Sequence, residues 1–157
     1  SDYDAMAEVF WASSLSHNNL TECGRGKDFS VHKLGHPLSA RFGVTHGASL
    51  ACVWGAWAAT LYRDALPRFA QFGRRVWNVC DEDDEAAAKK GIEKTVAFFR
   101  SIGMPVCIAD LDVDVTEDIL AQLALDATAN DTLRLSRIRP LNAKDVEAIY
   151  RLAMQKK

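Results

Sequence analysis

The segment that decides the fold of this chain reads VHKLGHPLSARFGVTHG and covers residues 31–47. Leu34 and Leu38 stand at helical spacing, Gly43 lies in a turn signal, and His46 follows at the expected start of another helix. The segment therefore predicts a helix, a tight turn and a second helix. It also holds three of the four histidines of the chain, and histidine is the commonest metal ligand and titrates near neutral pH.

Helical periodicity continues on both sides of this segment. Ser30 is expected to cap the helix that carries Leu34 and Leu38, and Pro37 predicts that this helix is short, begins late or is kinked, because proline lacks a backbone N–H. The other expected helices cover residues 5–20, 46–62, 67–78, 85–101, 116–128 and 143–154. The only β-like run is short. The sequence thus predicts an all-α fold, a single bundle-like domain of about seven helices.

Composition limits the classes of function. The chain has 157 residues, of which 48% are hydrophobic, so it can bury one sizeable core. A formal net charge of −2 gives no reason to expect nucleic acid or an anionic membrane as a partner. The longest apolar stretch, 48–62, is too short to span a bilayer. Widely spaced cysteines and an acidic start without a signal peptide predict reduced thiols and a cytoplasmic protein.

The spacing of the histidines favours a metal site. His32 and His36 are four residues apart and share one helix face, and His46 at the start of the next helix can approach that face. Two imidazoles from neighbouring helices could bind a divalent ion, which needs three or four ligands. The alternatives are histidines on the surface, or buried ones whose rings are hydrogen-bonded.

Three stretches carry a resemblance to a known family: WASSL at 11–15, FSVHKLGHPLSA at 29–40 and FGVTHG at 42–47. In them the chain resembles the iron-containing (group III) alcohol dehydrogenases, especially the butanol-dehydrogenase-like branch. The resemblance implies part of a dehydroquinate synthase-like C-terminal helical domain. It also implies that His32 and His46 are metal ligands and that His36 lies beside nicotinamide and substrate, as a proton-relay residue.

The chain departs from the family pattern in two ways. The family's other two ligands are an Asp and a His four residues later on an earlier helix, and no D-x-x-x-H stands ahead of the histidine motif; the D-x-x-x-H formed by Asp28 and His32 ends on the first histidine of the motif itself. No G-x-G-x-x-G phosphate loop is present either. Together with a start that lacks Met, this predicts a fragment: residues 1–157 form the C-terminal part of the helical metal-binding domain, and the N-terminal nicotinamide-binding domain is absent.

The resemblance implies a function for the full-length enzyme. That enzyme would transfer hydride between a primary alcohol or aldehyde and NAD(P), with a divalent ion, Fe²⁺ or else Zn²⁺, as Lewis acid. Its partners would be the alcohol or aldehyde and the missing N-terminal domain, and a homo-oligomer is left open. We expect the isolated chain to be inactive.

Two other functions compete with this one, a non-catalytic helical interaction module and a small metal-binding protein with its own two-histidine site. Among the aromatic residues, Phe29 and Phe42 flank the motif and are candidates to line a substrate pocket. Trp54, Trp57 and Phe72 stand at helical spacing and are expected in the core.

Overall fold

The structure, a computed structural model, describes residues 2–24 and 26–155. Within these ranges it contains no strand, only an isolated bridge between Leu135 and Leu141, so the all-α prediction is confirmed. The helices of the described residues are α1 (Tyr3–His17), α2 (Ser30–Phe42), α3 (His46–Leu61), α4 (Leu66–Trp77), α5 (Asp84–Ser101), α6 (Glu117–Ala127) and α7 (Ala143–Ala153), with short 3₁₀ turns at Leu20–Glu22, Tyr62–Ala65 and Ile108–Leu111.

Polar side chains fix several helix starts, but not that of α2: Ser30, its predicted cap, is the first residue of the helix, and the N-cap Phe29 makes no side-chain hydrogen bond. Asp2, Asp83 and Asn142 each accept a hydrogen bond from a backbone N–H in the first turn of α1, α5 and α7. Of the three outcomes predicted from Pro37, a short α2 and a late start are wrong, because the helix runs from Ser30 through Pro37 to Phe42, and a kink stays a prediction. Proline removes one backbone hydrogen bond there, and the carbonyl that loses its donor belongs to Lys33, an exposed residue that water can reach.

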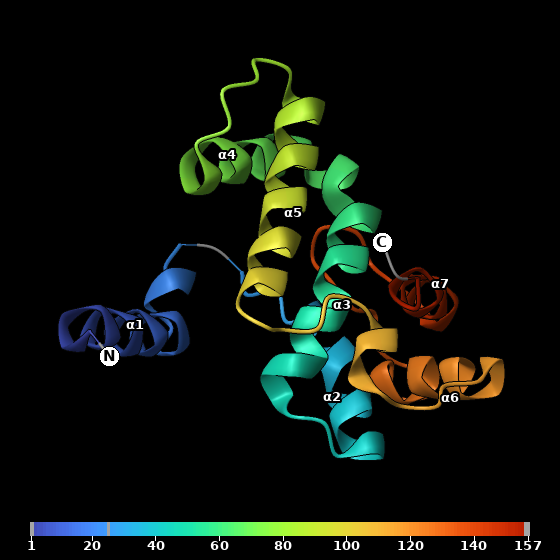
Figure 1. Cartoon of the computed structure of the whole chain (residues 1–157). Helices are drawn as coiled ribbons and strands as arrows, with labels where there is room; N and C mark the ends of the chain where they lie inside the picture. The colour runs from blue at the N-terminus through green and yellow to red at the C-terminus, as the bar shows by residue number, and fades with distance from the viewer. Residues whose placement is uncertain (1, 25, 156–157) are drawn as a thin grey trace.

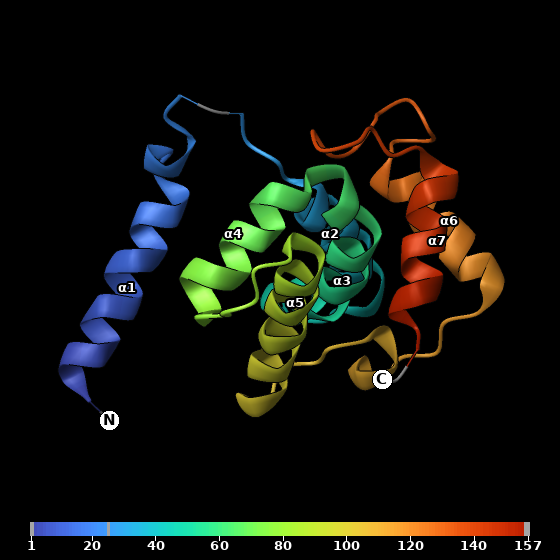
Figure 2. The same ribbon diagram turned by 90° about the horizontal axis from the view of Figure 1, so that it is seen from above.

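Helix α3 is the central element of the bundle. Figures 1 and 2 show α2, α5 and α7 arranged around it, with α4 beside α5 and α6 beside α7. The main core lies between α2, α3, α6 and α7 and includes the fully buried Leu34, Leu38, Val53, Leu123 and Ile149. A second cluster joins α3 to α4 and α5. Because both clusters contain α3, the position of this helix organises the whole bundle.

Helix α1 stands apart from the bundle (Figures 1 and 2). None of its residues is buried, and Tyr3, Val9, Phe10 and Trp11 are 57–84% exposed. A helix with apolar residues around its whole circumference is normally buried in a larger structure. In this chain by itself, α1 therefore presents an uncovered apolar surface.

The cysteines form no disulfide. Cys52 and Cys107 are buried and Cys23 and Cys80 are exposed, and all four thiols are free. Burial raises the pKa of the Cys52 thiol to about 12, so this thiol stays protonated. No helix in the described part of the chain is both long and apolar enough to cross a membrane.

A single buried hydroxyl ties α7 to α2. Tyr150 is fully buried, and its hydroxyl donates a 2.6 Å hydrogen bond to the backbone carbonyl of Leu34. Burial raises the pKa of this hydroxyl, which favours the protonated form that donates the hydrogen bond. The bond links residues 116 positions apart in the sequence, across the main core.

Replacing Tyr150 by Phe removes this bond and leaves the Leu34 carbonyl with one partner fewer in a buried place. We expect Tyr150→Phe to lower the free energy of unfolding by about 1–3 kcal/mol, measured by urea denaturation. The control is Tyr3→Phe, because Tyr3 is 84% exposed. Equal stability of the two variants would contradict the structural role of this hydroxyl.

Candidate metal centre

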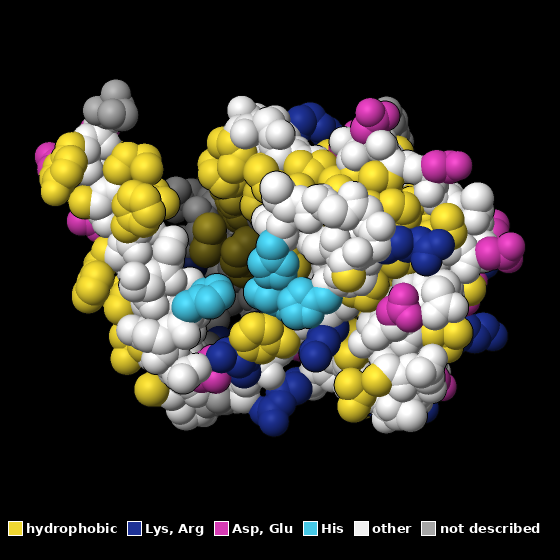
Figure 3. All heavy atoms as spheres, turned by 90° about the horizontal axis from the view of Figure 1, so that it is seen from below, with side chains coloured by type: hydrophobic (Ala, Val, Ile, Leu, Met, Phe, Trp, Pro, Cys, Tyr) yellow, Lys and Arg dark blue, Asp and Glu magenta, His cyan; other side chains and the backbone are white. Residues whose placement is uncertain are grey.

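The three histidines of the 31–47 segment, two on α2 and one at the start of α3, lie close together. The ring centroids of His32 and His46 are 5.2 Å apart, those of His36 and His46 5.3 Å, and those of His32 and His36 6.2 Å. Figure 3 shows the histidines gathered on one face of the molecule, beside a recess between α1 and the bundle. The expectation that His46 approaches the helix face of His32 is met.

The spacing of the rings suits a shared ion. Histidine nitrogens bind zinc at about 2.0–2.1 Å, and two such ligands in tetrahedral geometry place their ring centroids roughly 5 Å apart. The His32–His46 and His36–His46 pairs both have centroid separations near this value. His32 is half-buried and the other two histidines are exposed, so the site opens to solvent.

A tight contact between α2 and α3 sets this geometry. A Cβ at Gly35 would lie 2.6 Å from Leu50 Cδ2, 2.9 Å from Ser49 Oγ and 3.3 Å from the Ser49 backbone, so a side chain there requires Leu50 and Ser49 to move. The Ser39 hydroxyl donates to Ser49 Oγ across the same contact at 2.9 Å. Gly43 closes the turn with φ at +69°, a conformation that glycine adopts without strain.

We expect Gly35→Ala to force α2 and α3 apart, which overpacks the contact and moves His32 relative to His46. The free energy of unfolding should fall by about 1–3 kcal/mol in urea denaturation. Gly47→Ala is the matched control, because a Cβ at Gly47 would meet only Met104 Cε, at 3.7 Å. A Gly35→Ala variant as stable as the control would show that the contact tolerates a side chain.

The electrostatics favour a neutral ring at His32. Burial lowers the pKa of His32, and repulsion from the positive forms of His46 and His36 lowers it further. Metal ions bind neutral imidazole, so a lowered pKa keeps His32 in the ligand form at mildly acidic pH.

The donor set at this place is incomplete. Within residues 2–24 and 26–155, no group of three or more His, Cys, Asp or Glu side chains is arranged to hold a metal ion. The chemistry of the two facing imidazoles fits a divalent ion, whereas a closed site needs further ligands. Those ligands have to come from outside the described side chains or from water.

Two residues outside the histidine motif, His17 and Phe29, have rings close to that of His32. His17, at the end of α1, has its ring centroid 6.3 Å from that of His32, although it lies outside the motif. Phe29 packs 4.8 Å from His32, centroid to centroid, and is 37% exposed. Phe42, the other flanking aromatic residue, is half-buried and packs against the main core. No sequence signal pointed to His17, because a loop of irregular chain separates it from the motif.

An apolar groove of about 540 Å³ begins at the cluster. It is lined by His32 and Gly47 at one end and passes along α3 to Trp54 and Trp57, with Met104 on its other side. Both tryptophans are half-buried, and each lines the groove and also packs against the second apolar cluster. The indole N–H of Trp57 is buried without a hydrogen-bond partner in the described part of the chain.

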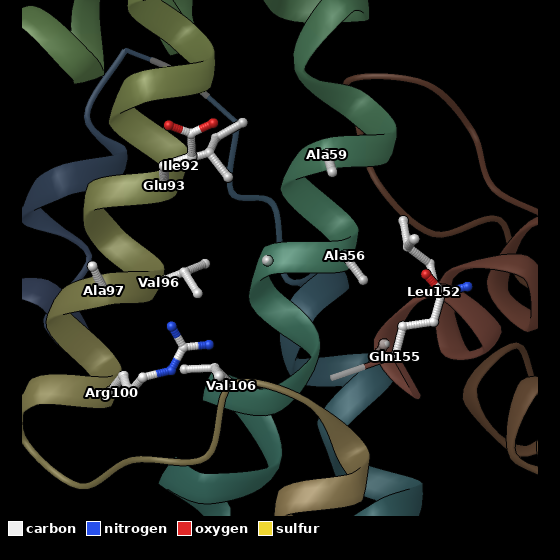
Figure 4. A pocket seen from close by; sticks show the side chains of 12 residues that line it. Ala56, Ala59, Ile92, Glu93, Val96, Ala97, Arg100, Val106, Leu152 and Gln155 are labelled. Carbon is white, nitrogen blue, oxygen red and sulfur yellow. The ribbon is translucent and has the colours of Figure 1, made fainter. Parts of the chain in front are cut away.

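A different cavity, of about 270 Å³, lies between α3, α5 and α7 (Figure 4). Ile92 and Val96 on α5 face Ala56 and Ala59 on α3 across it, and Leu152 lines the side of α7. The lining is mostly apolar, with Glu93, Arg100 and Gln155 as its polar members, and it holds no histidine or cysteine. The candidate centre is therefore at the α2–α3 histidines.

Fold and site together define a class: an all-helical domain that presents paired histidines from two adjacent helices. The model of the "Fe-containing alcohol dehydrogenase family, C-terminal" matches residues 1–154. The chain belongs to this family and corresponds to its C-terminal part.

Individual relatives agree. The chain is 34% identical to NADH-dependent butanol dehydrogenase A of Clostridium acetobutylicum over 152 residues, which is 96% of this chain and 39% of the relative. It is 32% identical to NADPH-dependent aldehyde reductase YqhD of Escherichia coli over 113 residues, 72% of this chain and 29% of that protein. The chain thus spans about two fifths or less of these relatives.

Solved structures show the same fold. The crystal structure of NADH-dependent butanol dehydrogenase A from Thermotoga maritima matches with a TM-score of 0.89 at 28% identity, over 98% of this chain and 40% of that one. A structure of the aldehyde reductase YqhD from E. coli, free of substrate and cofactor, matches with a TM-score of 0.88 at 27% identity, over 98% of this chain and 40% of that one.

Proposed function

We propose that this chain is the metal-holding helical part of an NAD(P)-dependent alcohol dehydrogenase that interconverts a primary alcohol and its aldehyde. The observation that carries the proposal is the pairing of His32 on α2 with His46 on α3, at 5.2 Å between ring centroids. The printed activities of two relatives, an NADH-dependent butanol dehydrogenase and an NADPH-dependent aldehyde reductase, support the reaction class.

Each histidine has a proposed role. His32 and His46 hold a divalent ion, Fe²⁺ or else Zn²⁺, and the ion when bound supplies Lewis acidity to the substrate oxygen. His36 is exposed and lies 5.3 Å from His46, centroid to centroid, so it can pass the proton of the substrate hydroxyl to solvent. The apolar groove beside His32 excludes water from one side of the reacting carbon.

In this proposal, sequence outside this chain supplies the remaining parts of the enzyme. A nicotinamide-binding domain and the other metal ligands are needed, because the described residues offer only a partial donor set. The isolated chain is then inactive and binds metal weakly, since each missing ligand lowers affinity. The free thiols agree with a reducing, cytoplasmic location as part of the same proposal.

The metal role of the two histidines is testable in a full-length enzyme that carries this segment. We expect His32→Ala and His46→Ala each to lower the bound metal, measured by elemental analysis of the purified protein, and to abolish turnover. His17→Ala is the control, because His17 lies near His32 but is assigned no ligand role. Wild-type metal content in the His32→Ala, His46→Ala double variant would remove the proposed role.

The proton role of His36 predicts a different signature. In the same full-length enzyme, His36→Gln should lower kcat at least tenfold and change the pH profile of kcat, while the metal content stays at the wild-type level. Loss of metal in this variant would instead make His36 a ligand. The isolated chain should not oxidise butanol with added NAD(P) and Fe²⁺, and measurable oxidation would contradict the proposed division of the enzyme.

One observation favours a second function. The uncovered apolar side chains of α1 suit a non-catalytic interaction module, in which this helix would bind a partner. The coding sequence upstream separates the two functions. A reading frame that encodes a nucleotide-binding domain and a D-x-x-x-H helix supports the dehydrogenase, and a start codon immediately before Ser1 supports the module.

A further inference from the structure

Another pocket, of about 230 Å³, lies next to the histidine cluster and shares wall residues with the apolar groove. It lies between the start of α2 and the segment 133–137, which precedes α7, and four basic side chains line it: Lys27, Lys33, Arg134 and Arg137. We call it the basic pocket. Figure 3 shows Lys and Arg side chains grouped next to the histidines on this face.

The charges of the basic pocket are only partly neutralised. Lys27 pairs with Glu22, and Arg134 pairs with Asp131 at 2.9 Å. Lys33 and Arg137 form no ion pair within the described part of the chain, so the pocket holds two cations without a salt-bridge partner.

Asp28, the one carboxylate in the wall, forms no ion pair with either cation but offsets part of their charge, so the lining keeps a net positive charge. Its oxygens already accept hydrogen bonds from the backbone N–H of Ser30 (2.8 Å), the hydroxyl of Ser30 (2.6 Å), the hydroxyl of Ser136 (2.7 Å) and the backbone N–H of Arg137 (2.9 Å). Asp28 thus joins α2 to the segment before α7 and shapes the pocket. An anion that enters would find the side chains of Lys33 and Arg137 available.

The Arg137 guanidinium lies against Gly26. A Cβ at Gly26 would clash with Arg137 Nη1 and Cζ, so the guanidinium occupies the space that a side chain at this position would need. The arginine thus lies beside the backbone of the loop that leads into α2. A planar guanidinium suits recognition of a carboxylate or phosphate.

One aromatic ring separates the basic pocket from the metal centre. Phe29 lines the pocket, its ring centroid is 4.8 Å from that of His32, and Lys27 Nζ lies 4.6 Å from the centre of the same ring. Asp28 and Ser30 line both the basic pocket and the apolar groove. A small molecule that reacts at the histidines can therefore reach the pocket with its other end.

We propose that the basic pocket binds the carboxylate or phosphate group of an acid-bearing alcohol or aldehyde whose oxygen reacts at the histidines. This inference rests on the proposed function for the reacting end, and the anion site itself stands on the geometry of Lys33 and Arg137. Recognition of an anionic end distinguishes such substrates from neutral alcohols of the same length, because a neutral end leaves both cations without a partner.

The test is a titration of the isolated chain, followed by NMR at the backbone amides of Lys33, Leu135 and Arg137. We expect saturable shifts in the millimolar range with inorganic phosphate and with 4-hydroxybutyrate, and none with 1-butanol, the neutral compound of matched length. The effect should weaken as salt rises. No saturable shift with either anion would overturn the proposal.

Variants locate the site. Lys33→Gln and Arg137→Gln should each weaken anion binding at least fivefold, and Gly26→Ala should weaken it at least threefold, because it displaces the guanidinium without changing any charge. Arg68→Gln is the control for loss of one surface charge, since Arg68 lies on α4 away from the pocket and bonds Gln71. Equal weakening by Arg68→Gln would identify non-specific attraction and overturn the proposal.

One further measurement distinguishes a substrate anion from a nucleotide phosphate, and another distinguishes the anion-site proposal from the metal-site proposal. In a full-length enzyme, Arg137→Gln should lower the ratio of kcat/KM for 4-hydroxybutyrate over 1-butanol at least fivefold, with the Arg68→Gln ratio unchanged. A changed preference between NADPH and NADH instead would assign the pocket to a nucleotide phosphate and contradict the substrate role. Anion binding by the isolated chain needs no metal, so it survives His32→Ala even if the metal proposal fails.

Discussion

The contact between α2 and α3 at Gly35 is the constraint on which the rest of the structure depends. With no side chain at this position, the backbone of α2 comes against Ser49 and Leu50, and the Ser39 and Ser49 hydroxyls bond across the contact. His32 lies one turn before Gly35, and His46 lies one turn before Ser49. The two rings meet because the helices that carry them are this close, and the same contact buries Leu34 and Leu38 in the main core.

Most of the remaining contacts hold α2 in that position. Tyr150 on α7 reaches the Leu34 carbonyl from the far side of the core, and Asp28 bonds both the start of α2 and the segment before α7. The histidine cluster and the basic pocket thus share one support. A change at the C-terminal part of the chain can alter the site through these two links, although no residue of α7 touches a histidine ring among the described contacts.

The apolar core of the described helices is well buried, whereas parts of their surface lack the groups that would cover or complete them. Helices α2–α7 bury two apolar clusters, whereas α1 leaves its apolar side chains exposed and the histidines lack further ligands. The histidines border the recess between α1 and the bundle (Figure 3). Relatives more than twice as long as the stretch they share with this chain have the additional sequence that such surfaces require.

The sequence by itself determined the helices, the family and the histidine pattern, because these depend on local spacing: apolar residues at helical period, caps at Asp2, Asp83 and Asn142, and the four-residue step from His32 to His36. Pro37 misled the reading of α2, since tertiary burial outweighs the loss of one hydrogen bond at an exposed carbonyl. Only the tertiary structure decided that His17 approaches His32, that Phe29 rather than Phe42 lies at the cluster, and that Arg137 stands beside Lys33. His17 and Arg137 belong to segments outside the motif, and nothing in local spacing encodes a contact that exists only when separate segments pack; Phe29 lies three residues before His32, but spacing alone did not distinguish it from Phe42.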